Sequence, residues 1–244
     1  TAQGLLQIFH PEATSLLKSH TISEPIVFWR WITPMAIALV TASAVFHWSM
    51  EGDAGPQKMF NRDAKLEDCQ ARATFLYDIV IGYNVSADGK WCLAIGIFQA
   101  APGVIAGTMQ LYSVDKRVSQ ILNGHTGTFA KIKIPGRVEE AQARDYRVLC
   151  FEEKKMDSPA KLYVMEVGRD KDAPGGVFRL SPQQIPTAAD TPNDFPVAMQ
   201  VSPKQDIIFM ITKMGYLFMF DIHSGKALYR AKISEQTIFV TTTQ

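Results

Sequence analysis

Histidine and cysteine are the residue types that most often carry catalysis or bind metal, but their spacing in this chain fits neither role. Cys69, Cys92 and Cys150 are an odd set without the short spacings of a zinc site, which favours reduced, buried thiols. The five histidines are also far apart, and we expect structural or solvent-exposed roles for them: His10, His20, His47, His125 and His223. We therefore predict no metal site.

Motifs for phosphate binding and for nucleophilic catalysis are also missing from the sequence. The segment Gly103–Gly107 (GVIAG) lacks the Lys-Ser/Thr pair of a phosphate-binding loop, and no Gly-x-Ser-x-Gly elbow occurs. A glycosidase would need carboxylates gathered around one site. The acids instead fall mainly in expected turns and loops, such as Asp53, Asp88, Asp115, Glu139 and Asp170. These observations leave an enzyme such as a glycosidase little support.

The charge and apolar content of the chain limit the partners it can have. Its 25 lysines and arginines balance 24 acidic residues, so it lacks the basic surface that a nucleic-acid partner requires. The most apolar stretch, Pro34–Phe46, is too short for a membrane span and is expected to form two core strands. No anchor or basic amphipathic helix is visible, so we expect any membrane contact to be indirect.

The elements that position these residues are expected to be β-strands, because one apolar-aromatic pattern returns five times. Successive copies lie roughly 40 to 65 residues apart, with other strand-like runs between them. Such recurrence is typical of a β-propeller, and a β-sandwich is the alternative fold. The five copies are Leu5–His10, Ala44–Ser49, Thr108–Ser113, Lys161–Glu166 and Tyr216–Asp221.

The last repeat contains one complete propeller blade. Four runs rich in β-branched and aromatic residues alternate with Gly, Pro and Ser turns: Pro196–Val201, Asp206–Thr212, Tyr216–Ile222 and Ala227–Ile233. This pattern predicts a four-stranded antiparallel meander. We expect one all-β domain of about five such blades, with approximate boundaries 1–24 (partial), 25–66, 67–134, 135–190 and 191–244. Because the first blade would begin at its third strand, the chain is interpreted as a piece of a larger propeller.

Several segments resemble the N-terminal propeller domain of the clathrin heavy chain family, in collinear order over nearly the whole chain. They include Phe28–Ile32, His47–Gly52, Gly107–Asp115, Asn193–Gln200 and Thr237–Thr241. The resemblance implies a seven-bladed ring of which about five blades are present, without the first blade or the ring closure. Similarity fades at residues 136–144 and 169–192, which are expected to form loops, and Ala71–Asp78 is interpreted as an insertion.

The resemblance also implies a function and a location. Clathrin-type propellers are scaffolds of vesicle coats that bind short linear motifs of adaptor and accessory proteins in endocytosis and intracellular transport. The resemblance thus implies a protein that is not an enzyme and uses no cofactor. The implied location is the cytoplasmic face of coated pits and vesicles at the plasma membrane, the trans-Golgi network and endosomes. A longer polypeptide would trimerise and bind clathrin light chain through regions outside this sequence. The alternative is a generic WD-type interaction propeller unrelated to coats.

One peptide-binding groove of the family, between its fourth and fifth blades, is matched most completely. The matching residues are Trp91, Leu111, Lys116, Val118, Gln120 and Leu122. The apolar members would form a trough, Lys116 would pair with an acidic residue of the peptide, and Gln120 would bond its backbone. The alternative is that these are ordinary sheet residues and a solvated turn charge.

Two other family sites are matched only in part. In the clathrin-box groove, Leu5, Gln7 and Phe9 would form one wall, but Thr14 and Leu16 stand where the family has basic residues. The attraction for an acidic motif would therefore be weaker at this groove. In the top-face site near the propeller axis, Ile81 and Ile97 match two apolar wall positions, and another part of that site lies upstream of residue 1.

Overall fold

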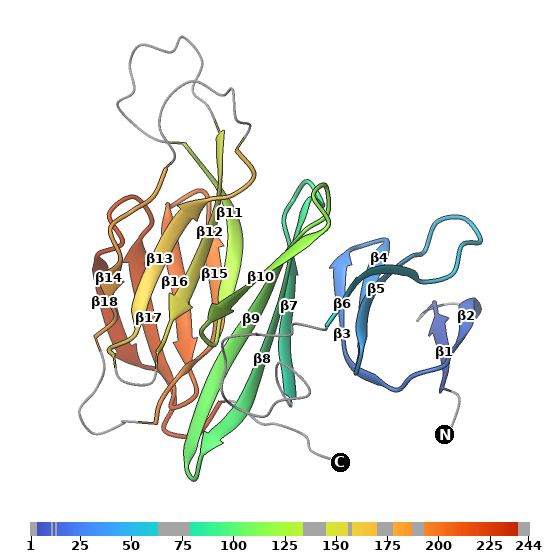
Figure 1. The fold of residues 1–244 in the computed structure, drawn as a ribbon, viewed down its shortest axis with the longest axis horizontal. Helices are drawn as coiled ribbons and strands as arrows, with labels where there is room; N and C mark the ends of the chain where they lie inside the picture. The colour runs from blue at the N-terminus through green and yellow to red at the C-terminus, as the bar shows by residue number, and fades with distance from the viewer. Residues whose placement is uncertain are drawn as a thin grey trace.

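The computed structural model describes residues 4–10, 12, 14–62, 79–133, 145–155, 158–169, 178–186 and 193–238. All regular elements in these ranges are β-strands, which confirms the predicted all-β class. In chain order the strands, labelled in Figure 1, are β1 (Gly4–Phe9), β2 (Leu16–Ile22), β3 (Ile26–Thr33), β4 (Ala36–Thr41), β5 (Ala44–Ser49), β6 (Gln57–Asn61), β7 (Ile79–Val85), β8 (Trp91–Ala101), β9 (Val104–Ser113), β10 (Val118–Asn123), β11 (Gly127–Lys133), β12 (Asp145–Glu153), β13 (Lys161–Glu166), β14 (Gln183–Gln184), β15 (Pro196–Ser202), β16 (Ile207–Thr212), β17 (Tyr216–Asp221) and β18 (Ala227–Lys232).

The strands form propeller blades arranged around a common axis. Four antiparallel meanders of four strands each, β3–β6, β7–β10, β11–β14 and β15–β18, follow a two-stranded hairpin of β1 and β2. The first strands of the meanders contact one another in succession, β3 with β7, β7 with β11, and β11 with β15. Figure 1 shows that the described blades form an open arc rather than a closed ring. This architecture confirms the predicted propeller of four-stranded blades.

The hydrophobic core lies between the blades, because side chains alternate across each strand and one strand serves two interfaces. In β8, Leu93 and Ile95 pack against the β11–β14 blade, whereas Cys92 and Ala94 pack against the β3–β6 blade. Strands β4 and β8 are consequently buried on both faces, which explains their nearly unbroken apolar sequences. Each large side chain buried in this way contributes about 1.5–3 kcal/mol, so neighbouring blades stabilise one another.

The recurring aromatic pattern coincides with the third strand of each blade, β5, β9, β13 and β17, and with β1 of the hairpin. Its matching residue is buried in three copies, since Trp48, Tyr112 and Phe220 are at most 8% exposed. Phe9 is 52% exposed, because the hairpin packs on the β3–β6 blade through the opposite face of β1. The repeat therefore marks a core position wherever a neighbouring blade covers it.

The expected blade boundary at residue 134 is wrong. Gly127–Lys133 is the first strand of the following blade, because it pairs with β12 along its whole length. The polar segment 136–144 suggested a division between blades, but it falls between two strands of one blade. The segment 169–192, expected to form a loop, contains β14, and its residue Arg179 forms a bridge with Met165. The proposed insertion at Ala71–Asp78 and the loop at 136–144 lie outside the described residues.

Candidate functional site

Five of the six residues predicted for the inter-blade groove lie on one face of the β7–β10 blade. Gln120 in β10 stands opposite Leu111 in β9, and Val118 and Leu122 lie two positions to either side of Gln120. Trp91 in β8 pairs with the same β9 residue as Val118. Opposed residues point to the same side of a sheet, so all five side chains share the face that packs against the β11–β14 blade.

The solvent exposure of these side chains increases from the buried floor of the groove to its edge. Leu111 is 6% exposed and belongs to the core cluster shared with the β11–β14 blade. Trp91 and Leu122 are half-buried at the margin of that cluster, whereas Val118 is 56% exposed and Gln120 is exposed. Strand β10 is also the outer strand of its sheet, so one edge of its backbone has no strand partner among the described residues. A ligand can therefore reach Val118, Gln120 and the β10 edge, while Leu111 supports them from below.

The Trp91 indole is held by the next blade along the chain. A Cβ atom on Gly168 would stand 2.6 Å from Trp91 Nε1 and 3.5 Å from Nη1 of Arg147. The absence of a side chain at Gly168 thus makes room for the indole between the two blades. Gly168 and Arg147 were not predicted for this site, because nothing near them in the sequence indicates which residue of the neighbouring blade they face.

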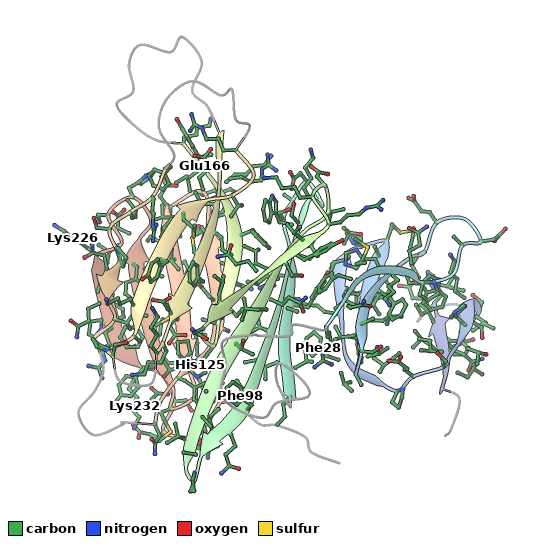
Figure 2. All side chains as sticks on the ribbon, in the orientation of Figure 1. Phe28, Phe98, His125, Glu166, Lys226 and Lys232 are labelled. Atoms are coloured by element: carbon green, nitrogen blue, oxygen red, sulfur yellow. The ribbon has the colours of Figure 1, made fainter. Side chains whose placement is uncertain are left out.

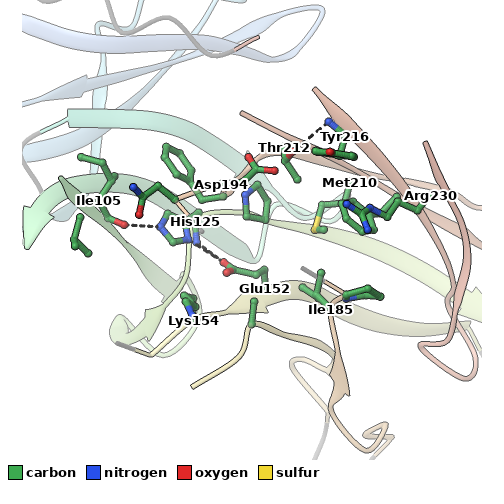
Figure 3. Close-up of a pocket in the computed structure, with 17 residues that line it drawn as sticks. Ile105, His125, Glu152, Lys154, Ile185, Asp194, Met210, Thr212, Tyr216 and Arg230 are labelled. Carbon is green, nitrogen blue, oxygen red and sulfur yellow. Dashed lines mark hydrogen bonds and ion pairs between the residues drawn. The ribbon is translucent and has the colours of Figure 1, made fainter. Parts of the chain in front are cut away.

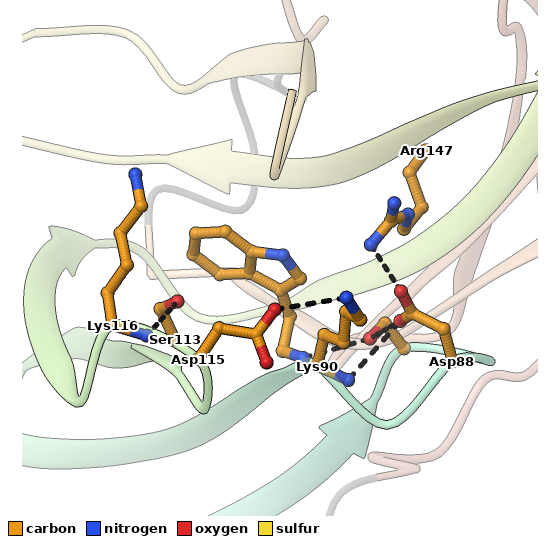
Figure 4. A network of polar contacts seen from close by, with 8 residues as sticks. Asp88, Lys90, Ser113, Asp115, Lys116 and Arg147 are labelled. Carbon is orange, nitrogen blue, oxygen red and sulfur yellow. Dashed lines mark hydrogen bonds and ion pairs between the residues drawn. The ribbon is translucent and has the colours of Figure 1, made fainter. Parts of the chain in front are cut away.

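A network of charges surrounds the same end of the groove (Figure 4). Arg147 pairs with Asp88 across the two blades, and Lys90 pairs with the exposed Asp115 at 3.1 Å. Burial acts to raise the pKa of Asp88, but hydrogen bonds from Ser86 and from the Lys90 backbone, together with the Arg147 charge, hold it below its ordinary value. Asp88 is therefore ionised near neutral pH and fixes Arg147 beside the indole.

Lys116 lies in the turn between β9 and β10, at the end of the row formed by Val118, Gln120 and Leu122. Its backbone N–H donates to Ser113 Oγ at 3.4 Å, which orders the turn. Its exposed ammonium group has no carboxylate within ion-pair distance among the described residues. The Lys116 charge is thus available beside the groove, and Figure 4 shows this side chain extended away from the Lys90–Asp115 pair.

The residues predicted for the clathrin-box wall also share one surface. Leu5, Gln7 and Phe9 alternate along β1 with the inward-facing Leu6 and Ile8, and all three are exposed. The nearby Lys18 points to the other side of the hairpin, where its Nζ donates to the Ser49 carbonyl at 2.8 Å. The hairpin therefore presents an apolar wall with one amide, and Lys18 does not supply the missing positive charge.

The two residues predicted for the top-face site lie on the paired strands β7 and β8 but differ in burial. Ile81 lines a cavity of about 290 Å³ near the first strands of the blades, together with Arg30 and Asn84. Ile97 is 4% exposed, pairs with Ile79 and does not line that cavity. Only Ile81 is placed where a ligand near the axis can reach it.

The groups that could carry metal or redox chemistry are buried and dispersed. No cluster of three or more His, Cys, Asp or Glu side chains that could hold a metal ion occurs within the described ranges. Cys92 and Cys150 are buried free thiols, as predicted, and burial raises their pKa to about 11 and about 12; Cys69 lies outside the described residues. None of the described residues belongs to a helix that could span a membrane.

The fold and the site together define a β-propeller with a groove between two blades, where an apolar floor, an exposed strand edge and the Lys116 ammonium group meet. Such a combination suits an extended peptide, whose backbone needs hydrogen bonds and whose side chains need apolar pockets.

Comparison with known proteins identifies the relatives of this propeller. The chain is homologous to a section of clathrin heavy chains. It is 43% identical to the clathrin heavy chain of Drosophila melanogaster over 240 residues, and 41% identical to clathrin heavy chain 2 of Homo sapiens over 236 residues. It is also 41% identical to probable clathrin heavy chain 1 of Caenorhabditis elegans over 236 residues. These alignments cover at least 97% of this chain but 13% of each relative. No protein-family model matches the chain.

Proposed function

We propose that this chain is an adaptor-binding propeller section of a clathrin heavy chain and acts as a scaffold of vesicle coats rather than as an enzyme. Two observations support the proposal: the relatives are clathrin heavy chains, and the predicted groove residues share one accessible face. The second observation carries the binding function, because Val118 and Gln120 are exposed on β10, beside the buried Leu111 of β9.

In this proposal the ligand is a short, extended peptide that lies along β10. Its apolar side chains would rest on Val118 and Leu122 and against the edge of the Trp91 indole. The Gln120 amide would bond the peptide backbone, and Lys116 would pair with an acidic residue of the peptide. A short motif buries little surface, so each contact is weak, and many copies in one coat would supply avidity.

The partners and the location follow from the same assignment. The partners would be adaptor and accessory proteins that carry short linear motifs, at the cytoplasmic face of coated pits and coated vesicles during endocytosis and intracellular transport. Trimerisation and light-chain binding would belong to regions of a longer polypeptide beyond the residues aligned here. Membrane contact would be indirect, through the adaptors.

The hairpin face of Leu5, Gln7 and Phe9 is proposed as a second peptide wall with a different preference. It offers apolar contacts and one amide, and the nearby Lys18 points to the other side of the hairpin, so this face would favour apolar over acidic motifs. A third, axial site is proposed for Ile81 alone, since Ile97 is enclosed in the core.

Fluorescence anisotropy with labelled adaptor peptides tests the main groove. Gln120→Ala should weaken binding about fivefold, as expected for the loss of one hydrogen bond worth about 1 kcal/mol. Gln205→Ala is the matched control, because Gln205 is exposed in the turn between β15 and β16. Equal affinities of both variants and the parent would refute the groove assignment. Leu111→Ala is unsuitable, since removing a buried leucine costs about 2–5 kcal/mol of stability.

A further inference from the structure

A second cavity of about 280 Å³ lies at the junction of the β11–β14 and β15–β18 blades (Figure 3). It is separate from the groove of Val118 and Gln120, which are not among its lining residues. Four apolar side chains from both blades form its floor, and each is at most 7% exposed: Ala160, Ile185, Met210 and Phe218. The cavity is therefore a preformed apolar recess.

Arg230 on β18 stands at one end of this recess. Its guanidinium lies 4.5 Å from the centre of the Tyr216 ring and 5.6 Å from that of Phe218. Stacking on the two rings positions the guanidinium and leaves the N–H groups at its rim able to donate hydrogen bonds. No carboxylate lies within ion-pair distance of Arg230 in the part of the chain that the structure describes.

The other charged groups of the cavity already have partners. His125 and Glu152, which are 3% and 1% exposed, contact each other at 3.2 Å. Lys154 donates to a backbone carbonyl at 2.7 Å, and Asp194 accepts a hydrogen bond from a backbone N–H at 2.9 Å. Arg230 is thus the charged lining residue whose hydrogen-bonding capacity is least used, and an anionic group is its complement.

We propose that this cavity binds a short peptide of a partner protein, with an aliphatic side chain in the apolar recess and a neighbouring acidic residue paired with Arg230. The volume lies below the roughly 300–1,000 Å³ of typical small-molecule sites, and it suits one or two side chains. The rim is open at Val104, which is 41% exposed, so a peptide backbone can continue past the recess. This site is additional to the groove on β10.

The probe is a fluorescein-labelled peptide with one leucine between paired aspartates, measured by anisotropy against the whole polypeptide that carries residues 1–244. All measurements use a Lys116→Glu and Gln120→Ala background, in which the loss of both polar contacts weakens the β10 groove and so separates the two sites. Arg230→Gln should weaken binding about tenfold. Lys226→Gln removes an exposed charge just before β18, outside the cavity, and should leave binding within twofold. A peptide with lysines in place of the aspartates should not bind.

Three results would overturn the proposal. The first is equal affinity of the Arg230→Gln and Lys226→Gln variants. The second is equal binding of the lysine peptide. The third is displacement of the probe by free N-acetylaspartate at the same concentration as by unlabelled peptide. That result would show that a carboxylate is sufficient and that the apolar recess has no role in binding. The urea transition of each variant is the folding control. Because Arg230 is exposed, Arg230→Gln should unfold as cooperatively as the parent.

Discussion

Trp91 and Gly168 meet across the gap between two blades, with the indole nitrogen 2.6 Å from the point where a Cβ atom on Gly168 would stand. This contact joins the β7–β10 blade to the turn that follows β13. It fixes the aromatic wall of the proposed groove from the side opposite to the ligand. The shape of the groove therefore depends on a residue that does not itself touch the peptide.

Gly168→Ala should destabilise the protein and weaken peptide binding together. Gly168 has a φ of +68°, which costs a residue with a Cβ atom about 1–2 kcal/mol, and the added atom would also displace the indole. Gly52→Ala is the matched control, because Gly52 has a φ of +63° with nothing near its Cβ position. Urea midpoints should fall in both variants, and anisotropy should show weaker binding only for Gly168→Ala. Equal binding by the two variants would show that the indole position does not matter.

Gly124→Ala should be far more damaging than its size suggests. A Cβ atom at Gly124 would stand 1.8 Å from the Glu152 carbonyl oxygen, so backbone rather than a flexible side chain must move. We expect a loss of more than about 3 kcal/mol in the free energy of unfolding, at the upper end for single substitutions. Gly4→Ala, with nothing within 4 Å of its Cβ position, should change the urea midpoint little. A mild effect of Gly124→Ala would mean that the two blades are not packed as closely as described.

His47 should make the stability of the propeller depend on pH. Burial lowers the pKa of His47 to about 4, and its Nε2 lies 2.8 Å from the Tyr83 hydroxyl. The unfolded chain, with a histidine pKa of about 6.5, binds the proton first. Stability is therefore complete above pH of about 6.5 and is lost as the pH falls toward 4, by about 2–3 kcal/mol at most.

The comparison of urea midpoints at pH 7 and pH 4.5 isolates this effect, because carboxylates titrate in the parent and in the variant alike. In His47→Gln the loss of stability between the two pH values should be smaller than in the parent by about 2 kcal/mol. Identical losses would show that His47 is solvated in the folded protein.

Lys116→Glu should weaken the binding of acidic peptides by about tenfold at low salt, because it replaces the free cation beside the groove with a like charge. Lys204→Glu makes the same change in charge at an exposed turn outside the groove and should have little effect. The difference between the two variants should shrink as salt is raised, because exposed charges are screened. A difference that persists unchanged in high salt would contradict an electrostatic role for Lys116.

Much of the fold could be predicted because its signals are local. Runs such as Asp206–Thr212 and Tyr216–Ile222 alternate with turn residues, and each agrees with an observed strand to within one residue. The two-residue spacing of Val118, Gln120 and Leu122 likewise predicts a shared face. The blade to which Gly127–Lys133 belongs could not be predicted, since a strand pattern does not specify the strand with which it pairs.

The rest of the site could not be predicted because it arises between segments distant in sequence. Nothing around Gly168 indicates that it faces Trp91, and nothing around Arg230 indicates that it lies beside a recess formed by two blades. The apolar residues predicted for the sites also differ in burial: Leu111 and Ile97 are buried in the core, whereas Val118 is exposed. Burial depends on the neighbouring blade, which a strand pattern does not specify.

Photo-crosslinking tests the peptide groove most directly. A benzophenone side chain would replace Val118, which is 56% exposed at the groove, or Leu228, which is 57% exposed on β18. A labelled adaptor peptide should crosslink at position 118, and excess unlabelled peptide should abolish the product, while position 228 should give little. Equal crosslinking at the two positions, or none at position 118 under conditions in which the peptide binds, would contradict the proposed function of the groove.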